Sequence, residues 1–273
     1  MRKFRKYWMT VMAMGTVSMA TAMATERYFT YSYEPETMPA GTAEFEQWVT
    51  WRGFRDAAVG QERYNKWELR EELEYGVTDN YTVSLYLNSS AENFRDPTTG
   101  NGESSTDFDG VSLEHRYMVL NPAEHPVGFA LYLETRYSGG EAEIEEKLIF
   151  GQRCGKWKWA CNIVHGTEWE ENLSETEGEF EVTFGLTRHL SPRWSVGFEA
   201  RDHNELPDYE YWENTAVFIG PVVTFTQEKW WATLTVLPQI YGNNFQGNPD
   251  ANHAMELEGH ERVNVRLIFG IGF

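Results

Sequence analysis

The sequence predicts an all-β fold: an antiparallel up-and-down transmembrane β-barrel of about 12 strands, with short periplasmic turns and longer extracellular loops. Three observations support this prediction. Apolar and polar residues alternate along many segments, short and long connections alternate between those segments, and the chain begins with a secretory signal pattern.

Residues 1–24 have the pattern of a secretory signal. Four basic residues among the first six precede an uncharged run from Trp8 to Ala20, and a small-residue cleavage pattern follows at Ala22-Met23-Ala24. An N-terminal membrane anchor is the alternative, but the run is shorter than the roughly 20 apolar residues that cross a bilayer. We therefore expect a signal removed after export, a periplasmic segment at residues 25–40 and an outer-membrane barrel over residues 41–273.

The acidic character of the chain narrows its partners. The net charge is −19, and it becomes −23 once the four basic residues of the signal are removed. We expect no nucleic-acid partner, because phosphates would be repelled. No later segment reads as a transmembrane helix, so any membrane crossing must be made by strands.

Segments with a period of two mark the strands. Side chains alternate between the two faces of a strand, so such a segment is apolar along one side. Twelve candidate strands lie near residues 42–52, 66–76, 80–89, 108–120, 126–137, 142–153, 157–168, 178–188, 193–203, 213–226, 229–241 and 261–273.

The connections between these strands alternate in length. An up-and-down barrel places all short connections at one end and all long ones at the other, and an even strand number leaves both termini in the periplasm. The short connections fall at residues 78–80, 121–126, 154–156, 189–192 and 227–228. The longer polar ones fall at residues 53–65, 90–107, 138–141, 170–177, 204–212 and 242–260.

Charged residues of both signs lie on the face opposite the apolar one. They recur at matching heights on successive strands, where a barrel lumen could pair them. A soluble lipocalin-like barrel or a sandwich, with its apolar face inside, is the main rival and would leave these charges in water. The predicted lumen charge ladder comprises Glu46, Glu68, Arg70, Glu72, Glu74, Glu114, Arg116, Glu134, Arg136, Glu199, Arg201 and His203.

The apolar face favours lipid as its neighbour. Rows such as Val83, Leu85 and Leu87 have about the height of a membrane strand. Four polar residues on this face need a bulge, a register change or an oligomer contact: Gln47, Glu71, His115 and Glu146. Aromatic residues at strand ends fit two interfacial girdles: Trp51, Trp67, Tyr75, Tyr117, Tyr137, Trp157, Trp169, Trp194, Trp212 and Trp231.

The last twelve residues, RVNVRLIFGIGF, form an alternating strand that finishes on a bare aromatic residue. This ending resembles the recognition signal that the barrel-assembly machinery reads in outer-membrane barrel proteins. The resemblance implies that machinery as a partner during biogenesis. It assigns the assembly signal to Val265, Leu267, Phe269, Ile271 and Phe273.

Five further stretches are EFEQWVT (44–50), LREELEYGVTDN (69–80), FDGVSLE (108–114), WSVGFEARDHNE (194–205) and KWWATLTVLPQ (229–239). Through them the chain resembles an uncharacterised family of Gram-negative outer-membrane β-barrel proteins. The resemblance implies a location in the cell outer membrane, among its lipid and lipopolysaccharide. It implies no activity.

No catalytic residue is predicted. The sequence lacks a Gly-x-Ser-x-Gly elbow, a His-Glu-x-x-His zinc motif, a phosphate-binding glycine-rich loop and an EF-hand spacing, so we expect no enzyme, cofactor or metal site. The strongest local cluster is Glu199, Arg201 and His203, where a histidine beside acids could act as a general base. A charge-paired lumen is the simpler interpretation.

Cys154 and Cys161 flank the stretch GKWKWA. In an oxidising compartment a pair this close could form a disulfide across a hairpin end, or the two could remain reduced thiols within a sheet. The sequence leaves both interpretations open.

The expected function follows from the size of the barrel. Twelve strands lie between the eight that side chains just fill and the sixteen that leave an aqueous channel. With Trp48, Tyr86 and Tyr132 facing inward, we expect a narrow, polar, partly occluded, porin-like channel for small polar solutes, whose acidic lumen disfavours anions. Two alternatives stay open: a lipid or surface-polymer hydrolase at Glu199 and His203, and a structural or partner-binding barrel that uses the loop at 242–260.

Overall fold

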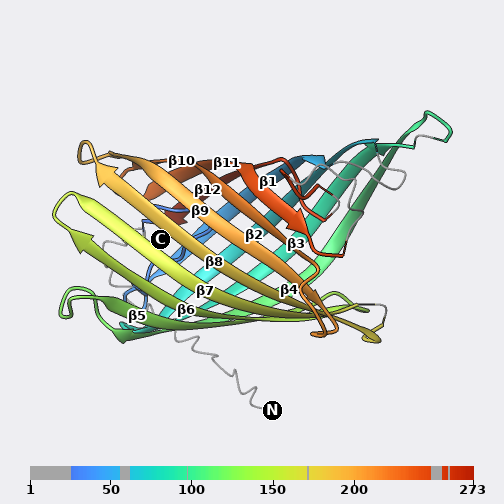
Figure 1. The fold of residues 1–273 in the computed structure, drawn as a ribbon. Helices are drawn as coiled ribbons and strands as arrows, with labels where there is room; N and C mark the ends of the chain where they lie inside the picture. The colour runs from blue at the N-terminus through green and yellow to red at the C-terminus, as the bar shows by residue number, and fades with distance from the viewer. Residues whose placement is uncertain (1–25, 56–61, 97, 171, 247–253, 258) are drawn as a thin grey trace, which may run out of the picture.

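The computed structural model describes residues 26–55, 62–96, 98–170, 172–246, 254–257 and 259–273, so the predicted signal lies outside the described residues. Within them, twelve antiparallel strands follow one another around a closed barrel, and β1 pairs with both β2 and β12 (Figure 1). The predicted fold class is confirmed. The strands are β1 Ala43–Arg55, β2 Glu62–Thr78, β3 Tyr81–Arg95, β4 Gly102–Leu120, β5 Gly128–Tyr137, β6 Ala142–Cys154, β7 Trp157–Glu170, β8 Glu175–His189, β9 Trp194–Pro207, β10 Asn214–Thr226, β11 Trp230–Asn244 and β12 Val263–Gly272.

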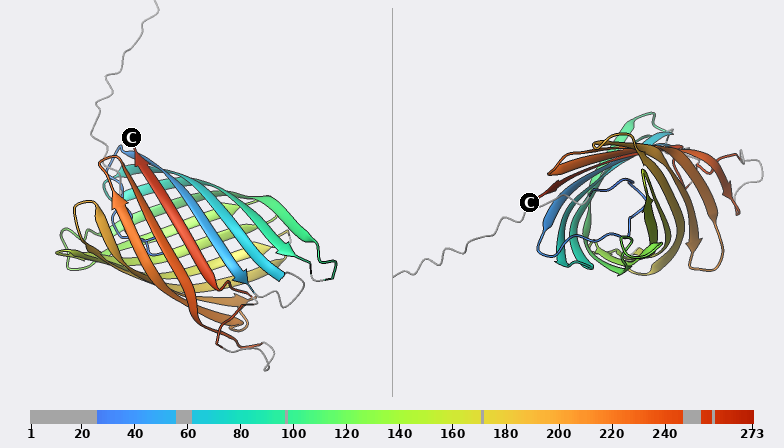
Figure 2. Two further views of the ribbon diagram at one scale, coloured as in Figure 1. Left: turned by 90° about the horizontal axis from the view of Figure 1, so that it is seen from above. Right: turned by 90° about the vertical axis from the view of Figure 1, so that its left-hand side faces the viewer.

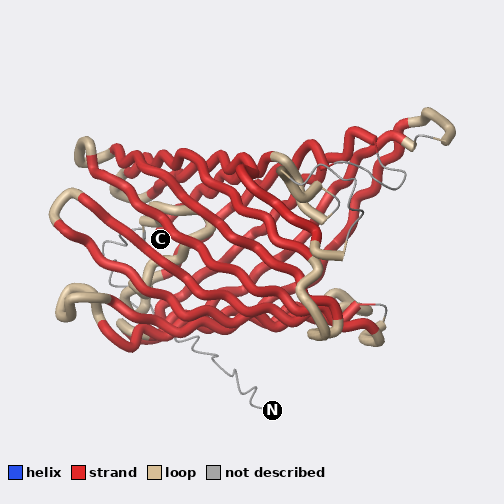
Figure 3. The backbone as a smooth tube through the Cα atoms, in the orientation of Figure 1, coloured by secondary structure: helices blue, strands red, loops and turns tan. Residues whose placement is uncertain are grey.

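In the described part of the chain, no helix has the length and apolar character needed to cross a membrane. The backbone is strand and loop throughout the barrel (Figure 3).

The largest difference from the predicted strands is at β3 and β4. Their hairpin extends well past the neighbouring strands (Figure 1), and its ladder still pairs Glu92 with Ser105 and Asn93 with Ser104. The sequence pattern placed the end of the first strand near residue 89 and the start of the second near residue 108, because it follows apolar residues. The backbone hydrogen bonds continue beyond these points between polar residues.

The apolar face looks outward. Leu73, Leu85 and Leu113 are 48, 47 and 43% exposed, although they sit in the middle of paired strands. In a closed barrel such exposure matches a hydrocarbon environment and excludes the soluble rival, whose apolar face would be inside. Ring positions follow the predicted girdles with one correction: Trp231 is fully buried in the lumen, and Trp230 takes the exterior position instead.

The polar residues on the lipid face have partners on neighbouring strands. Gln47 Nε2 lies 3.1 Å from Glu71 Oε1, and the two residues are opposite each other in a regular ladder. The hydroxyl of Tyr81 lies 2.8 Å from His115 Nδ1. Glu146 Oε2 lies 3.5 Å from Nδ1 of His165, its cross-strand neighbour. Paired side chains, rather than a register change at these positions, therefore accommodate them.

Residues 26–40, which precede the barrel in the chain, lie inside it, and for these residues this corrects the periplasmic placement predicted for 25–40. Figure 2 shows these residues within the ring of strands; we call them the lumen segment. It bonds to side chains on β1, β3, β7, β9 and β11, which lie all round the barrel. The physical reason is that irregular backbone needs hydrogen-bond partners, and the polar lumen wall supplies them.

Candidate functional site

The lumen segment is held by one carboxylate on the barrel wall. Glu199 of β9 is fully buried, and its two oxygens accept hydrogen bonds from three consecutive backbone N–H groups. The donors belong to Thr30, Tyr31 and Ser32, at 3.0, 2.9 and 2.9 Å. Hydroxyls of Thr30 and Thr235 donate to the same carboxylate. Successive N–H groups that converge in this way form a typical anion-binding concavity.

Further wall side chains fix the rest of the segment. Asn162 of β7 accepts a hydrogen bond from the backbone N–H of Tyr33 at 2.6 Å and donates to its carbonyl at 2.9 Å. The hydroxyl of Thr82 on β3 accepts from the N–H of Met38 at 2.9 Å. The segment is therefore bonded along its length and not only at one end.

Aromatic rings of the lumen segment fill the barrel centre. Tyr33 packs in a buried cluster with Trp48 and Tyr132, two of the three aromatic residues predicted to face inward. The third, Tyr86, is fully buried beside Trp48. Phe29 is fully buried in a second cluster that includes Ala160 and Val222. Apolar packing therefore occupies part of a lumen whose walls are otherwise polar.

Cations lie over these rings. The Arg27 guanidinium lies 4.0 Å from the centre of the Tyr33 ring, and that of Arg70 lies 4.2 Å from the Tyr86 ring. Arg266 lies 3.9 Å from the Tyr31 ring. Desolvated contacts of this type contribute about 2 kcal/mol each. Of these three contacts, the one between Arg266 of β12 and Tyr31 joins the lumen segment to the wall.

The residues of the predicted charge ladder face the lumen. Three of their ion pairs join strands that are not neighbours: Arg70 of β2 reaches Glu134 of β5, Arg116 of β4 reaches Glu74 of β2, and Arg136 of β5 reaches Glu168 of β7. Other pairs are Arg27 with Glu46, Arg52 with Glu68, and Arg136 with Glu143. The buried members are Glu46, Glu72, Glu74, Glu114, Arg116, Glu134, Glu199, Arg201 and His203, and the half-buried ones are Glu68, Arg70 and Arg136.

The predicted cluster of Glu199, Arg201 and His203 divides into two sites. Glu199 holds the lumen segment, whereas Arg201 and His203 share Glu181 of β8. Nδ1 of His203 lies 3.0 Å from Glu181 Oε2 and 2.6 Å from Arg201 Nη2. Because both Glu199 oxygens are already hydrogen-bonded, the geometry does not supply the acid–base pair that a hydrolase at Glu199 and His203 would need.

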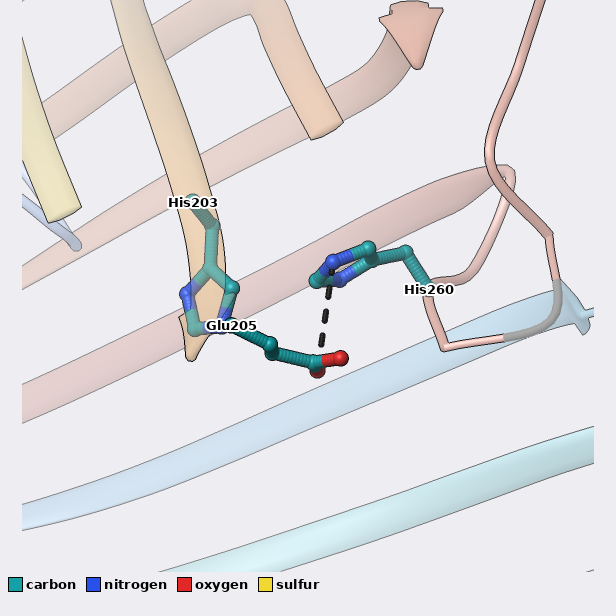
Figure 4. A group of neighbouring side chains, drawn as sticks. All are labelled: His203, Glu205 and His260. Atoms are coloured by element: carbon teal, nitrogen blue, oxygen red, sulfur yellow. Dashed lines mark ion pairs between the residues drawn. The ribbon is translucent and has the colours of Figure 1, made fainter. Parts of the chain in front are cut away.

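His203 has a second set of neighbours on its side facing the end of the barrel that carries the long loops. Glu205, two residues further along β9, and His260, just before β12, each have a ligand atom within 4.8 Å of one on His203, and the Glu205 carboxylate extends towards His260 (Figure 4). The two imidazole ring centres are 5.0 Å apart, and His260 Nε2 lies 3.9 Å from Glu205 Oε1. Burial, with the nearby His203 and the positive charge of Arg201, lowers the pKa of His260 well below its usual range.

Comparison with known proteins places the chain in a family. The model of a family of unknown function, DUF6662, matches residues 21–146 and 154–273. The chain belongs to the DUF6662 family. This confirms the resemblance to an uncharacterised family. No curated protein sequence matches the DUF6662 chain.

A solved structure shares the fold of this DUF6662 protein. The COG4313 outer membrane channel from Pseudomonas putida F1 matches with a TM-score of 0.62 and 10% identity, over 90% of this chain and 100% of that one. The NanC porin has a TM-score of 0.49 and 10% identity, over 84% and 98% of the two chains. At this identity the likeness to the COG4313 channel shows the fold alone, which is that of an outer-membrane barrel.

The two cysteines of the DUF6662 protein are free thiols, which is one of the two interpretations that the sequence left open. Cys154 is opposite Trp157, and Cys161 is opposite Phe150. The two cysteines are therefore four ladder positions apart, roughly 13 Å at the usual rise of a strand. A disulfide needs Cα atoms within about 7 Å.

The residues of the predicted assembly signal lie on the closing strand β12 of the DUF6662 barrel or directly after it. Leu267, Phe269 and Ile271 are 41, 37 and 40% exposed on the exterior, and Phe273 is 64% exposed. Val265 pairs with Trp51 of β1 and with Val236 of β11. The signal is thus accessible along the outer face.

Sequence reasoning missed several residues of this lumen. Asn162 and His260 belong to no local motif, and their neighbours come from distant parts of the DUF6662 chain. Glu205 ends the quoted stretch WSVGFEARDHNE, but its place beside His260 does not follow from that stretch. One signal was available: the stretch RYFTYSY at 27–33 is too aromatic for a free periplasmic linker. The loop at 242–260, considered for partner binding, lies partly outside the described residues.

Proposed function

We propose that the protein is a narrow porin-like channel for small polar solutes, in which the lumen segment forms the constriction. The signal at residues 1–24 is removed on export, and the barrel inserts into the outer membrane. The observation that carries the proposal is the course of the lumen segment through a closed, charge-lined barrel. Solutes must pass between the lumen segment and the wall.

The charge of the lumen sets the preferred solute. Carboxylates outnumber cations in the ladder, and the mature chain would carry a net charge of −23 once the signal is removed from a chain of −19. Rings of carboxylates favour cations in a pore. We therefore expect cation preference, measured as the reversal potential across a bilayer with a salt gradient.

Substitution of Glu199→Gln tests the constriction. Either orientation of the glutamine amide places an NH2 group against backbone N–H donors of the lumen segment. Each lost hydrogen bond to a charged group costs about 1.5–3 kcal/mol. We expect the segment to loosen and single-channel conductance in planar bilayers to increase.

Glu68→Gln is the matched control. It removes the same charge from the lumen, but Glu68 pairs with Arg52 and Lys66 on the wall. Its conductance should stay close to that of the unsubstituted protein. If the unsubstituted protein, Glu68→Gln and Glu199→Gln all insert fully into the bilayer and none conducts ions, the channel proposal is wrong.

A further inference from the structure

Two imidazoles and a carboxylate converge near the end of the lumen that carries the long loops. One ligand atom from each of His203, Glu205 and His260 lies within 4.8 Å of the other two (Figure 4). His203 and Glu205 are neighbours on the inner face of β9, and His260 reaches them from the segment before β12. The three side chains thus come from two parts of the chain that only barrel closure brings together.

The surroundings hold the two imidazoles in place. His203 and His260 are 6 and 3% exposed. Glu181 lies 3.0 Å from His203 Nδ1, and the Asn214 side-chain oxygen lies 2.8 Å from His260 Nε2. Metal-binding histidines usually have such a carboxylate or carbonyl partner on the ring nitrogen that does not bind the ion. These contacts would leave Nε2 of His203 and Nδ1 of His260 as the nitrogens for an ion.

The peptide before His260 is fixed as well. One carboxylate oxygen of Glu256 accepts hydrogen bonds from the backbone N–H groups of Gly259 and His260, at 3.0 and 2.9 Å. The Asn214 amide donates to Glu205. The three side chains are therefore positioned by contacts of their own and need only small rotations to meet at one ion.

The local charge is compatible with a cation. Arg201 lies beside His203 and opposes a positive ion, but it is paired with Glu181. Glu205 also belongs to a second group of convergent carboxylates, with Glu177 and Glu213. Arg52 and Arg55 add positive charge near His260, so three arginines stand against the four carboxylates of Glu177, Glu181, Glu205 and Glu213.

We propose that His203, Glu205 and His260 bind one divalent transition-metal ion of the zinc type near the long-loop end of the lumen. Two imidazole nitrogens and one carboxylate oxygen suit Zn²⁺, which also leaves a fourth position for water or a solute. Calcium and magnesium prefer oxygen ligands alone, so they fit the set poorly. The ion links β9 to the segment that enters β12.

The test is the binding of Zn²⁺ to the folded, tag-free protein in detergent, measured by competition with a chromogenic chelator. We expect one ion per barrel. Glu205→Gln and His260→Gln should each weaken binding by about tenfold or more, since each removes one ligand. His165→Gln, which changes an exposed histidine on the outer wall, should bind as the unsubstituted protein does.

Three results would overturn the site. One is that Zn²⁺ does not bind; another is that Glu205→Gln and His260→Gln bind as tightly as the unsubstituted protein. The third is Ca²⁺ binding of equal strength that survives His260→Gln, which would assign the ion to Glu177, Glu205 and Glu213 instead. Heat-dependent migration in gels checks the fold of each variant. If His260→Gln does not fold, two other measurements test the site. Glu205→Gln should still bind zinc more weakly, and the X-ray absorption spectrum of the unsubstituted protein should show two imidazole ligands on the bound zinc.

Discussion

At the scale of single residues, Glu199 shows what alternation along a strand can and cannot predict. The period of two correctly places its carboxylate on the inner face of β9. Its hydrogen-bond donors in the lumen segment are 167 to 169 positions away in the sequence. A local motif therefore gives the direction of the side chain but not its partner.

Glu34 should make the docking of the lumen segment pH-dependent. Burial raises its pKa from 4.5 to about 7, although Lys158 opposes the rise, and Glu36 adds to it. In an undocked segment the Glu34 carboxyl would titrate near its ordinary pKa of 4.5. As pH rises from 4.5 through 7, the free energy of docking therefore becomes less favourable by up to about 3 kcal/mol, because the docked carboxyl resists ionisation. We expect channel conductance to be lowest below pH 5 and to increase towards pH 8.

Glu34→Gln separates this effect from other titrations. Glutamine remains neutral and can still accept the hydrogen bond from the Tyr28 N–H. The variant should keep the low conductance at pH 8. An unchanged pH profile in Glu34→Gln would show that another group controls docking.

At the scale of elements, the wall of the barrel is shaped to admit the lumen segment. Gly185 faces inward on β8, and a Cβ at this position would lie 2.3 Å from the Phe29 ring. A Cβ at Gly270 of β12 would lie 2.4 Å from the Trp231 ring. The two glycines leave room where an aromatic ring of the interior comes close to the backbone of the strand. The alternation of apolar residues in the sequence does not predict these positions.

Gly185→Val should displace the lumen segment. The added side chain overlaps the Phe29 ring, and overpacking of this kind costs about 1–3 kcal/mol. We expect higher single-channel conductance and a lower temperature of heat-induced gel shift. Gly102→Val is the control, since its Cβ meets no atom within 4 Å; equal effects of the two substitutions would contradict a specific role for Gly185.

At the scale of the whole molecule, closure depends on the first and last strands. β12 pairs with β1 from Gly272 opposite Glu44 to Val263 opposite Gly53. The backbone N–H of Phe273 donates to the carbonyl of Ala43 at 3.0 Å, but its ring is 64% exposed. The ring thus contributes little to the packing of the folded barrel and is free to serve as part of a recognition signal.

Phe273→Ala should affect assembly more than stability. We expect less folded protein in the outer membrane of expressing cells, while refolding into detergent and the urea midpoint change by no more than about 1 kcal/mol. Leu131→Ala, an outward leucine of β5 with 44% exposure, is the control. An equal loss of stability in vitro for Phe273→Ala would give the ring a structural role instead.

The sequence by itself determined the strands and which residues share a face, because both depend on a local repeat. Leu85 and Leu113 had to lie on one side of their strands, Glu114 and Arg116 on the other, and connection lengths fixed the meander. Strand ends were less well predicted where polar residues continue a ladder, as at Asn93 and Ser104.

Only the tertiary structure decided what fills the barrel. The lumen segment has no repeat to indicate its position, and its backbone finds hydrogen-bond partners only after twelve strands have closed around it. The folded barrel brings His203 and His260 together, whereas the register of the β6–β7 hairpin keeps Cys154 and Cys161 apart. The physical reason is that a strand pattern fixes which way a side chain points, whereas its partner depends on distances that exist only in the closed barrel.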